Sequence, residues 1–363
     1  MPDGSNPDQS QGKLHKFIGV EKILVIKLRL IGDVLLSTPA ISALKRHFPG
    51  ARISALVNSG TGEVLEGNPD LDEIIVFDSG LRKVSGLGKY AREALFLRDL
   101  RRKGFDMAVD LTSSDRSAMA AFLSGARYRL AFRSKKNFLG RNLLFTHLAE
   151  FDPSFHVVLS HLDMLEQMGI RGSNPSLYFA VSEADDALAI KITGGRKDLV
   201  HIHPVSSLPK KCWRDEYMAA LIDHLIEVGL TPVLTAGPIP AEGERIKKIL
   251  SMVREKDRVI DLGGRLTLKQ VGALAGRARL FIGVDSAPMH IAAAVGAPVV
   301  ALFGPTSETL WAPWCEKRLI LSRDMPCRLP CKRKRTCYTY ECLNSITPEE
   351  AARKIDRFIG EIA

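Results

Sequence analysis

Short apolar runs alternate with amphipathic stretches along most of this chain. In the first half, stretches with helical periodicity lie near residues 37–47, 88–102 and 114–123, and another extends from about His156 to Met168. Between them lie runs with the length of buried strands: KILVIKL, RISALV, EIIVFD, MAVDL and YRLAF. Strands that alternate with helices predict a parallel sheet with helical crossovers on both faces.

The same pattern restarts after the connector GIRGSNPSLYFAVSEADD, which is rich in Gly, Pro and Ser. Its strand-like runs are DLVHIHPV, TPVLTAG, RVIDLGG, LFIGVD, PVVALFG and RLILS, and its helical stretches lie near residues 214–228, 241–254, 267–275 and 287–295. A last helix, TPEEAARKIDRFIGEI, starts with Thr347 and Glu350 in the spacing of a capping box. The chain is therefore predicted to be an α/β protein, with two doubly wound, Rossmann-like domains that face each other across a cleft.

Length and turn composition place the expected domain boundaries. A chain of 363 residues suits two domains of ordinary size. We expect an N-terminal domain over residues 21–180, a C-terminal domain over 181–346 and a final helix over 347–363. The polar, turn-rich residues 1–20 are expected to form a flexible tail, and they contain no apolar signal-peptide core, which predicts a cytoplasmic protein. No run of about 18 apolar residues is present that could cross a membrane.

Positive charge is unevenly spread over the sequence. The net charge is +10, and residues 127–141 and 328–335 form two strongly basic windows. Such windows favour a polyanionic partner, namely a phosphorylated glycolipid, an anionic membrane surface or nucleic acid, although a solvated basic face would have the same composition. Few aromatic residues are interleaved for base stacking, so we expect no nucleic-acid partner.

Asp33 follows the apolar run KILVIKLRLIG, where a carboxylate is costly to bury unless it is used. The first strand-to-helix turn of such a domain opens into the ligand crevice, and Gly32 permits a close approach of the backbone there. A carboxylate within reach of a hydroxyl can remove its proton, which raises a reaction rate by about 10²- to 10⁴-fold. The alternative role for Asp33 is an N-cap of the following helix.

Asp285 ends another apolar run, in the segment LFIGVDSAPMHIAAAVGAPVVALFGPT. Ser286 is placed to cap a helix that contains His290, and the amides of Ser286 and Ala287 would then point into the cleft and bind phosphate. Asp285 would itself repel phosphate, so we expect it to orient a hydroxyl or the amides of its own loop. A strand-to-helix turn with an Asp cap and no ligand is the alternative.

The segment HIHPVSSLPKKCW follows a third predicted strand. Ser206 and Ser207 offer hydroxyls, and Lys210 and Lys211 offer cations at the mouth of the same sheet. A lysine there can neutralise the charge that develops on a departing phosphate. Two solvent-exposed lysines in a loop are the alternative. Jointly, these segments describe a site for a phosphate leaving group on one domain, facing a base on the other.

The cysteines leave several possibilities open. Cys327, Cys331, Cys337 and Cys342 fall within sixteen residues, while Cys212 and Cys315 lie elsewhere. Their C-x3-C-x5-C-x4-C spacing lacks the C-x2-C pairs that are typical of zinc sites. Reduced structural thiols, a bound metal and a disulfide all remain possible, although disulfides are disfavoured in a cytosolic protein.

In their order and spacing, the segments KILVIKLRLIGDVLLSTPAISALKRHFPGARISALV, HPVSSLPKKCW and FIGVDSAPMHIAAAVGAPVVALFGPT resemble glycosyltransferase family 9, the ADP-heptose:lipopolysaccharide heptosyltransferases. The resemblance covers nearly all of the chain after residue 20 and is strongest with the heptosyltransferase III-type branch. It implies a GT-B fold, with the active site between two Rossmann-like domains and a C-terminal helix packed back toward the N-terminal domain. It also implies metal-independent, inverting transfer of heptose from ADP-L-glycero-β-D-manno-heptose, without a cofactor. The implied acceptor is the phosphorylated inner core of lipopolysaccharide, at the cytoplasmic face of the anionic inner membrane.

The resemblance also implies roles for individual positions. Asp33 aligns with the family's general base, and Lys211 aligns with the lysine that contacts the donor diphosphate. Leu266 falls where a residue packs on the adenine, and Glu242 falls where one meets the ribose. The other expected donor-binding positions are Ser206, Ser207, Asp285, Ser286, Ala287 and His290. The acceptor-binding positions expected from the first basic window are Arg127, Arg129, Arg133, Lys135 and Lys136.

Other functions remain open at this stage. A family 9 transferase could use another nucleotide sugar or another acceptor. Tandem Rossmann-like domains also suit a nucleotide-dependent oxidoreductase, although no glycine-rich dinucleotide fingerprint follows a predicted strand. A non-catalytic adaptor built on the basic windows and a cysteine-ligated metal is a third possibility.

Overall fold

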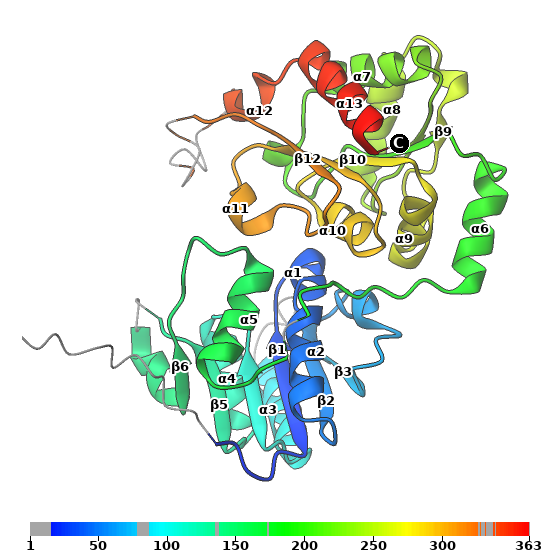
Figure 1. The fold of residues 1–363 in the computed structure, drawn as a ribbon. Helices are drawn as coiled ribbons and strands as arrows, with labels where there is room; N and C mark the ends of the chain where they lie inside the picture. Colours follow the sequence, from blue (N-terminus) through cyan, green and yellow to red (C-terminus); the bar gives the residue numbers. More distant parts are fainter. Residues whose placement is uncertain are drawn as a thin grey trace, which may run out of the picture.

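The structure, a computed structural model, describes residues 16–77, 87–134, 138–172, 174–325, 327, 331, 337 and 339–362. It contains two six-stranded sheets, one in each half of the chain (Figure 1). Every pair of neighbouring strands is parallel in both sheets. The two doubly wound domains that the hydrophobic pattern predicts are therefore present.

The N-terminal sheet has the strand order β3-β2-β1-β4-β5-β6. Its strands are β1 (Lys22–Lys27), β2 (Arg52–Asn58), β3 (Glu73–Phe77), β4 (Met107–Asp110), β5 (Tyr128–Phe132) and β6 (His147–Ala149). Its helices are α1 (Ile31–Leu35), α2 (Thr38–His47), α3 (Leu87–Arg102), α4 (Asp115–Leu123) and α5 (Val157–Gln167). The order reverses between β1 and β4, and this switch point is where ligands of such sheets bind.

The C-terminal sheet repeats this topology in the order β12-β11-β10-β7-β8-β9. Its strands are β7 (Leu199–His203), β8 (Thr231–Leu234), β9 (Ile260–Asp261), β10 (Leu280–Val284), β11 (Val299–Phe303) and β12 (Arg318–Ser322). Its helices are α6 (Glu183–Thr193), α7 (Asp215–Glu227), α8 (Pro240–Leu250), α9 (Leu268–Arg277), α10 (Ala287–Ala294), α11 (Glu308–Trp311), α12 (Glu341–Asn344) and α13 (Pro348–Ile362). Its switch point lies between β7 and β10.

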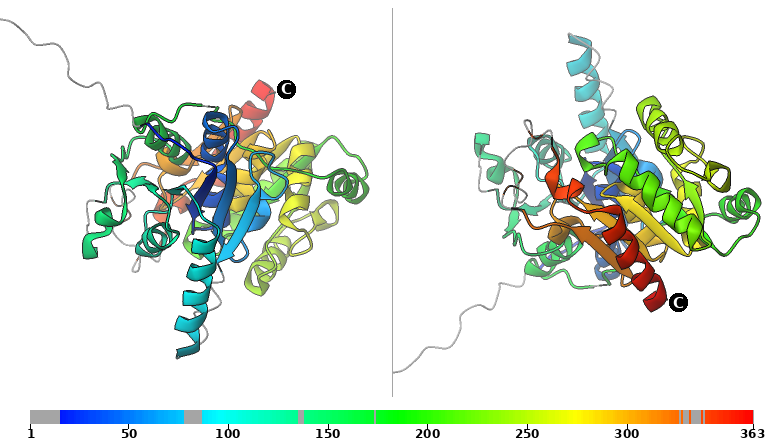
Figure 2. Two further views of the ribbon diagram at one scale, coloured as in Figure 1. Left: turned by 90° about the horizontal axis from the view of Figure 1, so that it is seen from below. Right: turned by 90° about the horizontal axis from the view of Figure 1, so that it is seen from above.

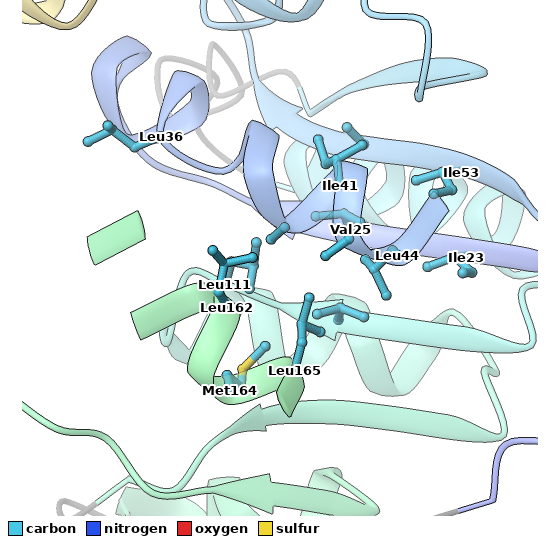
Figure 3. Close-up of a cluster of buried hydrophobic side chains, with 14 of the residues drawn as sticks. Ile23, Val25, Leu36, Ile41, Leu44, Ile53, Leu111, Leu162, Met164 and Leu165 are labelled. Carbon is cyan, nitrogen blue, oxygen red and sulfur yellow. The ribbon is translucent and has the colours of Figure 1, made fainter. Parts of the chain in front are cut away.

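The central strands are apolar because helices cover both of their faces. Alternate residues of β1 belong to different clusters, with Ile23 and Val25 on one face and Leu24 and Ile26 on the other. Figure 3 shows the first face, where side chains of α2 and α5 pack around β1. Each fully buried side chain of this size contributes about 1.5–3 kcal/mol through removal from water. This rigid packing fixes the carboxyl end of β1.

The two domains face each other through the carboxyl ends of their strands. In Figure 1, α1 and α5 of the N-terminal domain point toward α9, α10 and α11 of the C-terminal domain. Helix α1 packs against α10, and Lys269 of α9 donates a hydrogen bond to the carbonyl of Glu66 at 2.8 Å. The chain crosses between the sheets in the segment that contains the predicted boundary at residue 180.

Two features of the expected domain arrangement are wrong. The final helix was expected to pack back toward the N-terminal domain, but α13 packs on α7 within the C-terminal domain (Figure 1; Figure 2, right). The reason is its apolar face, on which Ile355 and Phe358 join the buried cluster of that domain. The expected tail over residues 1–20 is also too long, because Phe17 packs edge-on against Tyr128, with ring centroids 5.0 Å apart.

Within the part of the chain that the structure describes, no helix is both long enough and apolar enough to span a bilayer.

Candidate active site between the two domains

A cavity of about 1070 Å³ lies between the carboxyl ends of the two sheets. Residues of both domains line it, and the volume exceeds the upper range of sites for single drug-sized ligands. It therefore has room for two substrates at once.

Asp33 reaches this cavity from the first turn of α1. Leu30 is the N-cap of that helix, so the alternative role of Asp33 as a capping residue is excluded. Among the described residues, no donor makes a hydrogen bond to its carboxylate, although the side chain is only partly exposed. The Asp33 carboxylate is thus accessible from the cleft, where it can accept a proton from a bound hydroxyl.

Lys211 and Asp285 form an ion pair on the opposite wall. The ammonium lies 2.7 Å from Oδ2 of Asp285 and 3.3 Å from its carbonyl oxygen. Both side chains are largely buried, at 16% and 8% exposure. Asp285, which directly follows β10, therefore orients Lys211, and both residues line the cavity. The alternative of a solvent-exposed loop lysine is therefore excluded for Lys211, whereas Lys210 does not line the cavity.

The start of α10 also opens onto the cavity. Ser286 occupies the N-cap position, but its hydroxyl makes no capping bond, which differs from the expected cap. Its Oγ is buried without a hydrogen-bond partner among the described residues. Ser286 and Ala287 both line the cavity. A free hydroxyl next to the amides of a helix start is a suitable place for an anion.

His290 lies one turn further along α10, at the contact between the two domains. It is 4% exposed and lines the cavity. Burial lowers the pKa of its imidazole, while the nearby carboxylates of Asp285 and Asp33 act in the opposite direction. The ring is therefore expected to be neutral near pH 7. Its Nδ1 has no hydrogen-bond partner in the described part of the chain.

Gly32 allows α1 to approach α10 this closely. A Cβ at residue 32 would lie 2.8 Å from Cδ2 of His290 and 3.6 Å from Cα of Ala287. We expect Gly32→Ala to separate the two helices and to lower kcat/KM by about 10- to 100-fold, because a misplacement of about 1 Å at the reacting groups has this effect. Steady-state kinetics would measure the change. The matched control is Gly50→Ala, where a Cβ would meet nothing within 4 Å; equal activity of both variants would contradict the close packing.

The other expected donor-binding residues separate into two groups. Ser206 and Ser207 follow β7 and line the cavity, as does Glu242, whose Oε2 accepts a hydrogen bond from the amide of Gly237 at 2.8 Å. Leu266 does not line it. Its side chain packs against the buried cluster that includes Leu262 and Leu274, and it is therefore directed toward the core of the C-terminal domain.

Only part of the first basic window, residues 127–141, lies at the cavity. Arg133 lines the cavity, with its Nε 2.5 Å from Oε1 of Glu150. Arg127 and Arg129 lie at the opposite, amino end of β5 and do not line it. Their guanidinium groups donate to backbone carbonyls, including those of Ile18, Leu144 and Ala126. Lys135 and Lys136 lie outside the described residues.

Several cavity residues were missed by sequence reasoning. On the N-terminal wall they are Lys27, Arg29, Thr112, Ser160 and His161; on the C-terminal wall they include His203. Of these residues, Lys27 had the clearest signal in the sequence, because a lysine inside an otherwise apolar strand is unusual. His203 is held at Nδ1 by Thr235 at 2.9 Å, and burial lowers its pKa to about 4.

The cysteines and other metal-ligand types form no centre among the residues that the structure describes. No group of three or more His, Cys, Asp or Glu side chains is arranged to hold a metal ion there. Cys212, Cys315, Cys327, Cys331 and Cys337 form no disulfide with a described residue.

Comparisons with known proteins agree on one family. The model of glycosyltransferase family 9 (heptosyltransferase) matches residues 94–340. Lipopolysaccharide heptosyltransferase 3 of Escherichia coli is 32% identical over 310 residues, which are 83% of this chain and 90% of that protein.

Solved structures show the same fold. A glycosyltransferase family 9 protein of Veillonella parvula DSM 2008 superposes with a TM-score of 0.81 at 24% identity, over 94% of this chain and 98% of that one. The ADP-heptose lipopolysaccharide heptosyltransferase II of Escherichia coli has a TM-score of 0.76 at 21% identity, over 94% of this chain and 99% of that one. The expected GT-B architecture is confirmed.

Proposed function

Since this chain belongs to glycosyltransferase family 9, the heptosyltransferases, we propose that it transfers heptose from ADP-L-glycero-β-D-manno-heptose to the inner core of lipopolysaccharide. The name of its 32% identical relative, lipopolysaccharide heptosyltransferase 3, supports this class of acceptor. The name of a structurally similar protein, the ADP-heptose heptosyltransferase II, supports this donor.

The observation that carries the proposal is a shared cavity with complementary walls. Asp33 lies on the wall of the N-terminal domain, and Lys211 lies with the start of α10 on the wall of the C-terminal domain. One wall can accept a proton and the other can stabilise negative charge. These are the two requirements of a transfer in which a hydroxyl replaces a nucleoside diphosphate.

The proposed reaction is a single in-line displacement. The Asp33 carboxylate takes the proton of an acceptor hydroxyl while that oxygen forms a bond to the anomeric carbon of the donor. The bond between this carbon and the diphosphate oxygen breaks, and its electron pair leaves with ADP. One displacement inverts the anomeric configuration.

The charge that develops on ADP is neutralised by the protein in this mechanism. The Lys211 ammonium and the amides of Ser286 and Ala287 would hold the diphosphate, with the hydroxyls of Ser206 and Ser207 at the same edge of the sheet. Glu242 would meet the ribose. A lysine and a helix start supply the positive charge that a divalent cation would otherwise provide, so we propose that transfer needs no metal.

The acceptor would occupy the N-terminal wall. Arg133 and Arg141 line the cavity there and are suited to phosphate or acid groups of the inner core. We also propose that the protein works at the cytoplasmic face of the inner membrane, attracted to anionic lipid by its net charge of +10.

A thermal-shift panel tests the donor part of the proposal. ADP and ADP-heptose, in buffer with EDTA, are expected to raise Tm by several degrees, since a ligand at about 100 times its Kd adds about 2.7 kcal/mol to the free energy of unfolding. UDP, UDP-sugars and NAD at the same concentration are expected to leave Tm within about one degree. Stabilisation by UDP-sugars instead would favour another donor, and stabilisation by NAD alone would favour an oxidoreductase.

A further inference from the structure

Lys27 is a cation buried in the cavity wall. It ends β1, is 5% exposed, and donates a hydrogen bond from Nζ to the carbonyl of Leu111 at 2.8 Å. Nε2 of His161 lies 3.1 Å from the same nitrogen. In the described ranges, no carboxylate oxygen lies within ion-pair distance of it. A lysine ammonium has three N–H donors, so one remains unused in a place where an uncompensated charge is costly.

Helix α5 places two more polar groups in the wall of the same cavity. Val157, Ser160 and His161 share one face of the helix, and all three line the cavity. Ser160 is 2% exposed, and its hydroxyl has no hydrogen-bond partner in the part of the chain that is described. Burial, with the charge of Lys27, keeps the pKa of His161 well below its ordinary value. The ring is therefore neutral, and its Nε2 can accept a hydrogen bond from the Lys27 ammonium.

The position of Lys27 in the fold is that of a ligand-binding residue. Its contact with Leu111 bridges the ends of β1 and β4, which are the strands at the switch point of the N-terminal sheet. The same point of the C-terminal sheet, between β7 and β10, holds the Lys211–Asp285 pair. Lys211 has a carboxylate partner there, whereas Lys27 has none among the residues with described positions.

We propose that Lys27, Ser160 and His161 form a subsite for one acidic group, a carboxylate or a phosphate, on the acceptor sugar. The inference rests on the proposed function, in which the N-terminal wall holds the acceptor. Lys27 and Ser160 donate hydrogen bonds to the acid, while His161 and the Leu111 carbonyl orient the ammonium. The bound acid supplies the missing counter-charge, and it positions the acceptor hydroxyl for Asp33, which also lines this wall.

The subsite has a definite pH dependence. Burial lowers the pKa of the Lys27 ammonium to about 8; the nearby charge of Arg29 also lowers it, while those of Asp33 and Asp110 act in the opposite direction. Below that pH the group is charged and attracts an anion. As the pH rises through about 8, the free protein loses this proton, so the affinity for the acidic group is expected to fall. A neutral acceptor would show no such fall.

Kinetics with paired acceptors test the subsite. The probes are an inner-core fragment with one free acid and the same fragment with that acid as a methyl ester. Wild type is expected to prefer the free acid by about 10- to 100-fold in kcat/KM, the usual effect of a hydrogen bond to a charged group. Lys27→Met is expected to abolish the preference, and Ser160→Ala to reduce it several-fold. The control Lys45→Met removes a lysine that also donates to a backbone carbonyl but lies outside the cavity, and it is expected to retain the preference.

An equal loss for both acceptors in Lys27→Met would overturn the proposal, because a structural role affects both alike.

A direct binding measurement separates this inference from the proposed function. In protein with ¹³Cε-labelled lysine, the Lys27 resonance, identified by its absence in Lys27→Met, is expected to titrate near pH 8. Its pKa is expected to rise by about one unit when a bound anion pairs with it; separate titrations with acetate and inorganic phosphate distinguish the two acids.

The outcomes of the titration are distinct. A Lys27 resonance that responds to neither anion overturns the subsite, even if heptose transfer is observed. A resonance that responds in a protein without heptosyltransferase activity supports the subsite and refutes the proposed function.

Discussion

Replacement of Asp33 by Asn is expected to lower kcat by about 10²- to 10⁴-fold, because the amide keeps the shape of the side chain but cannot accept a proton. Asp33 lies in the first turn of α1, and Leu30 and not Asp33 is the N-cap, so the substitution removes no capping bond. The binding of ADP is expected to be unchanged, since its proposed site lies on the other domain. Steady-state kinetics and calorimetry with ADP would measure the two quantities.

Asp115→Asn is the matched control for this variant. Asp115 also lies in the first turn of an N-terminal-domain helix, α4, but does not line the cavity. Its kcat is expected to equal that of wild type. If Asp33→Asn kept kcat within a few-fold of wild type while folding normally, another group would have to remove the proton.

Hydrophobic periodicity was sufficient to predict most of the fold. The central strands are buried on both faces, so they appear in the sequence as continuous apolar runs, and the observed helices begin and end close to the expected positions. Strand β6 was missed because it has only three residues. Helix α6 overlaps the expected connector, although Ser182 and Asp185 have the spacing of an N-cap and accordingly form that hydrogen bond.

Strand direction explains why the first basic window predicted only some of the arginines that line the cavity. Its residues are close in sequence, and a cluster was expected. Arg129 and Arg133 are four residues apart on and after β5, however, and a strand rises about 3.3 Å per residue. They therefore lie about 13 Å apart, one near the amino end and one at the carboxyl end that faces the cavity. The strand end, and not the local charge density, decides which arginine can reach a ligand.

Contacts between site residues that are distant in the sequence could not be predicted from the sequence. Lys211 and Asp285 were expected to act separately, but they are 74 positions apart and form one ion pair. Lys27 was interpreted only as part of a strand, because its role depends on β4 and α5, which approach it in the folded chain. Such partners follow from the order of strands in the sheet, which local periodicity does not determine.

Lys211→Met is expected to have two large and separable effects. Asp285 is 8% exposed, and without Lys211 its carboxylate would lose its cation partner. Removing one partner of a buried pair costs up to about 3–5 kcal/mol in the free energy of unfolding, so Tm is expected to fall. The affinity for ADP is expected to fall by at least about 10-fold, because a charge-assisted hydrogen bond to the diphosphate contributes about 1.5–3 kcal/mol.

The double variant Lys211→Met/Asp285→Asn separates these effects. It leaves no unpaired carboxylate, so its Tm is expected to recover most of the loss, whereas its affinity for ADP is expected to stay low because no cation faces the diphosphate. Lys248→Met is the control, since Lys248 pairs with Asp215 at 2.8 Å outside the cavity and should leave ADP binding unchanged. Recovery of both Tm and ADP affinity in the double variant would make Lys211 a purely structural partner of Asp285. Recovery of Tm alone would mean that the charge of Lys211 has two roles. It compensates the buried carboxylate of Asp285, which holds Lys211 in place, and it binds the diphosphate of the donor.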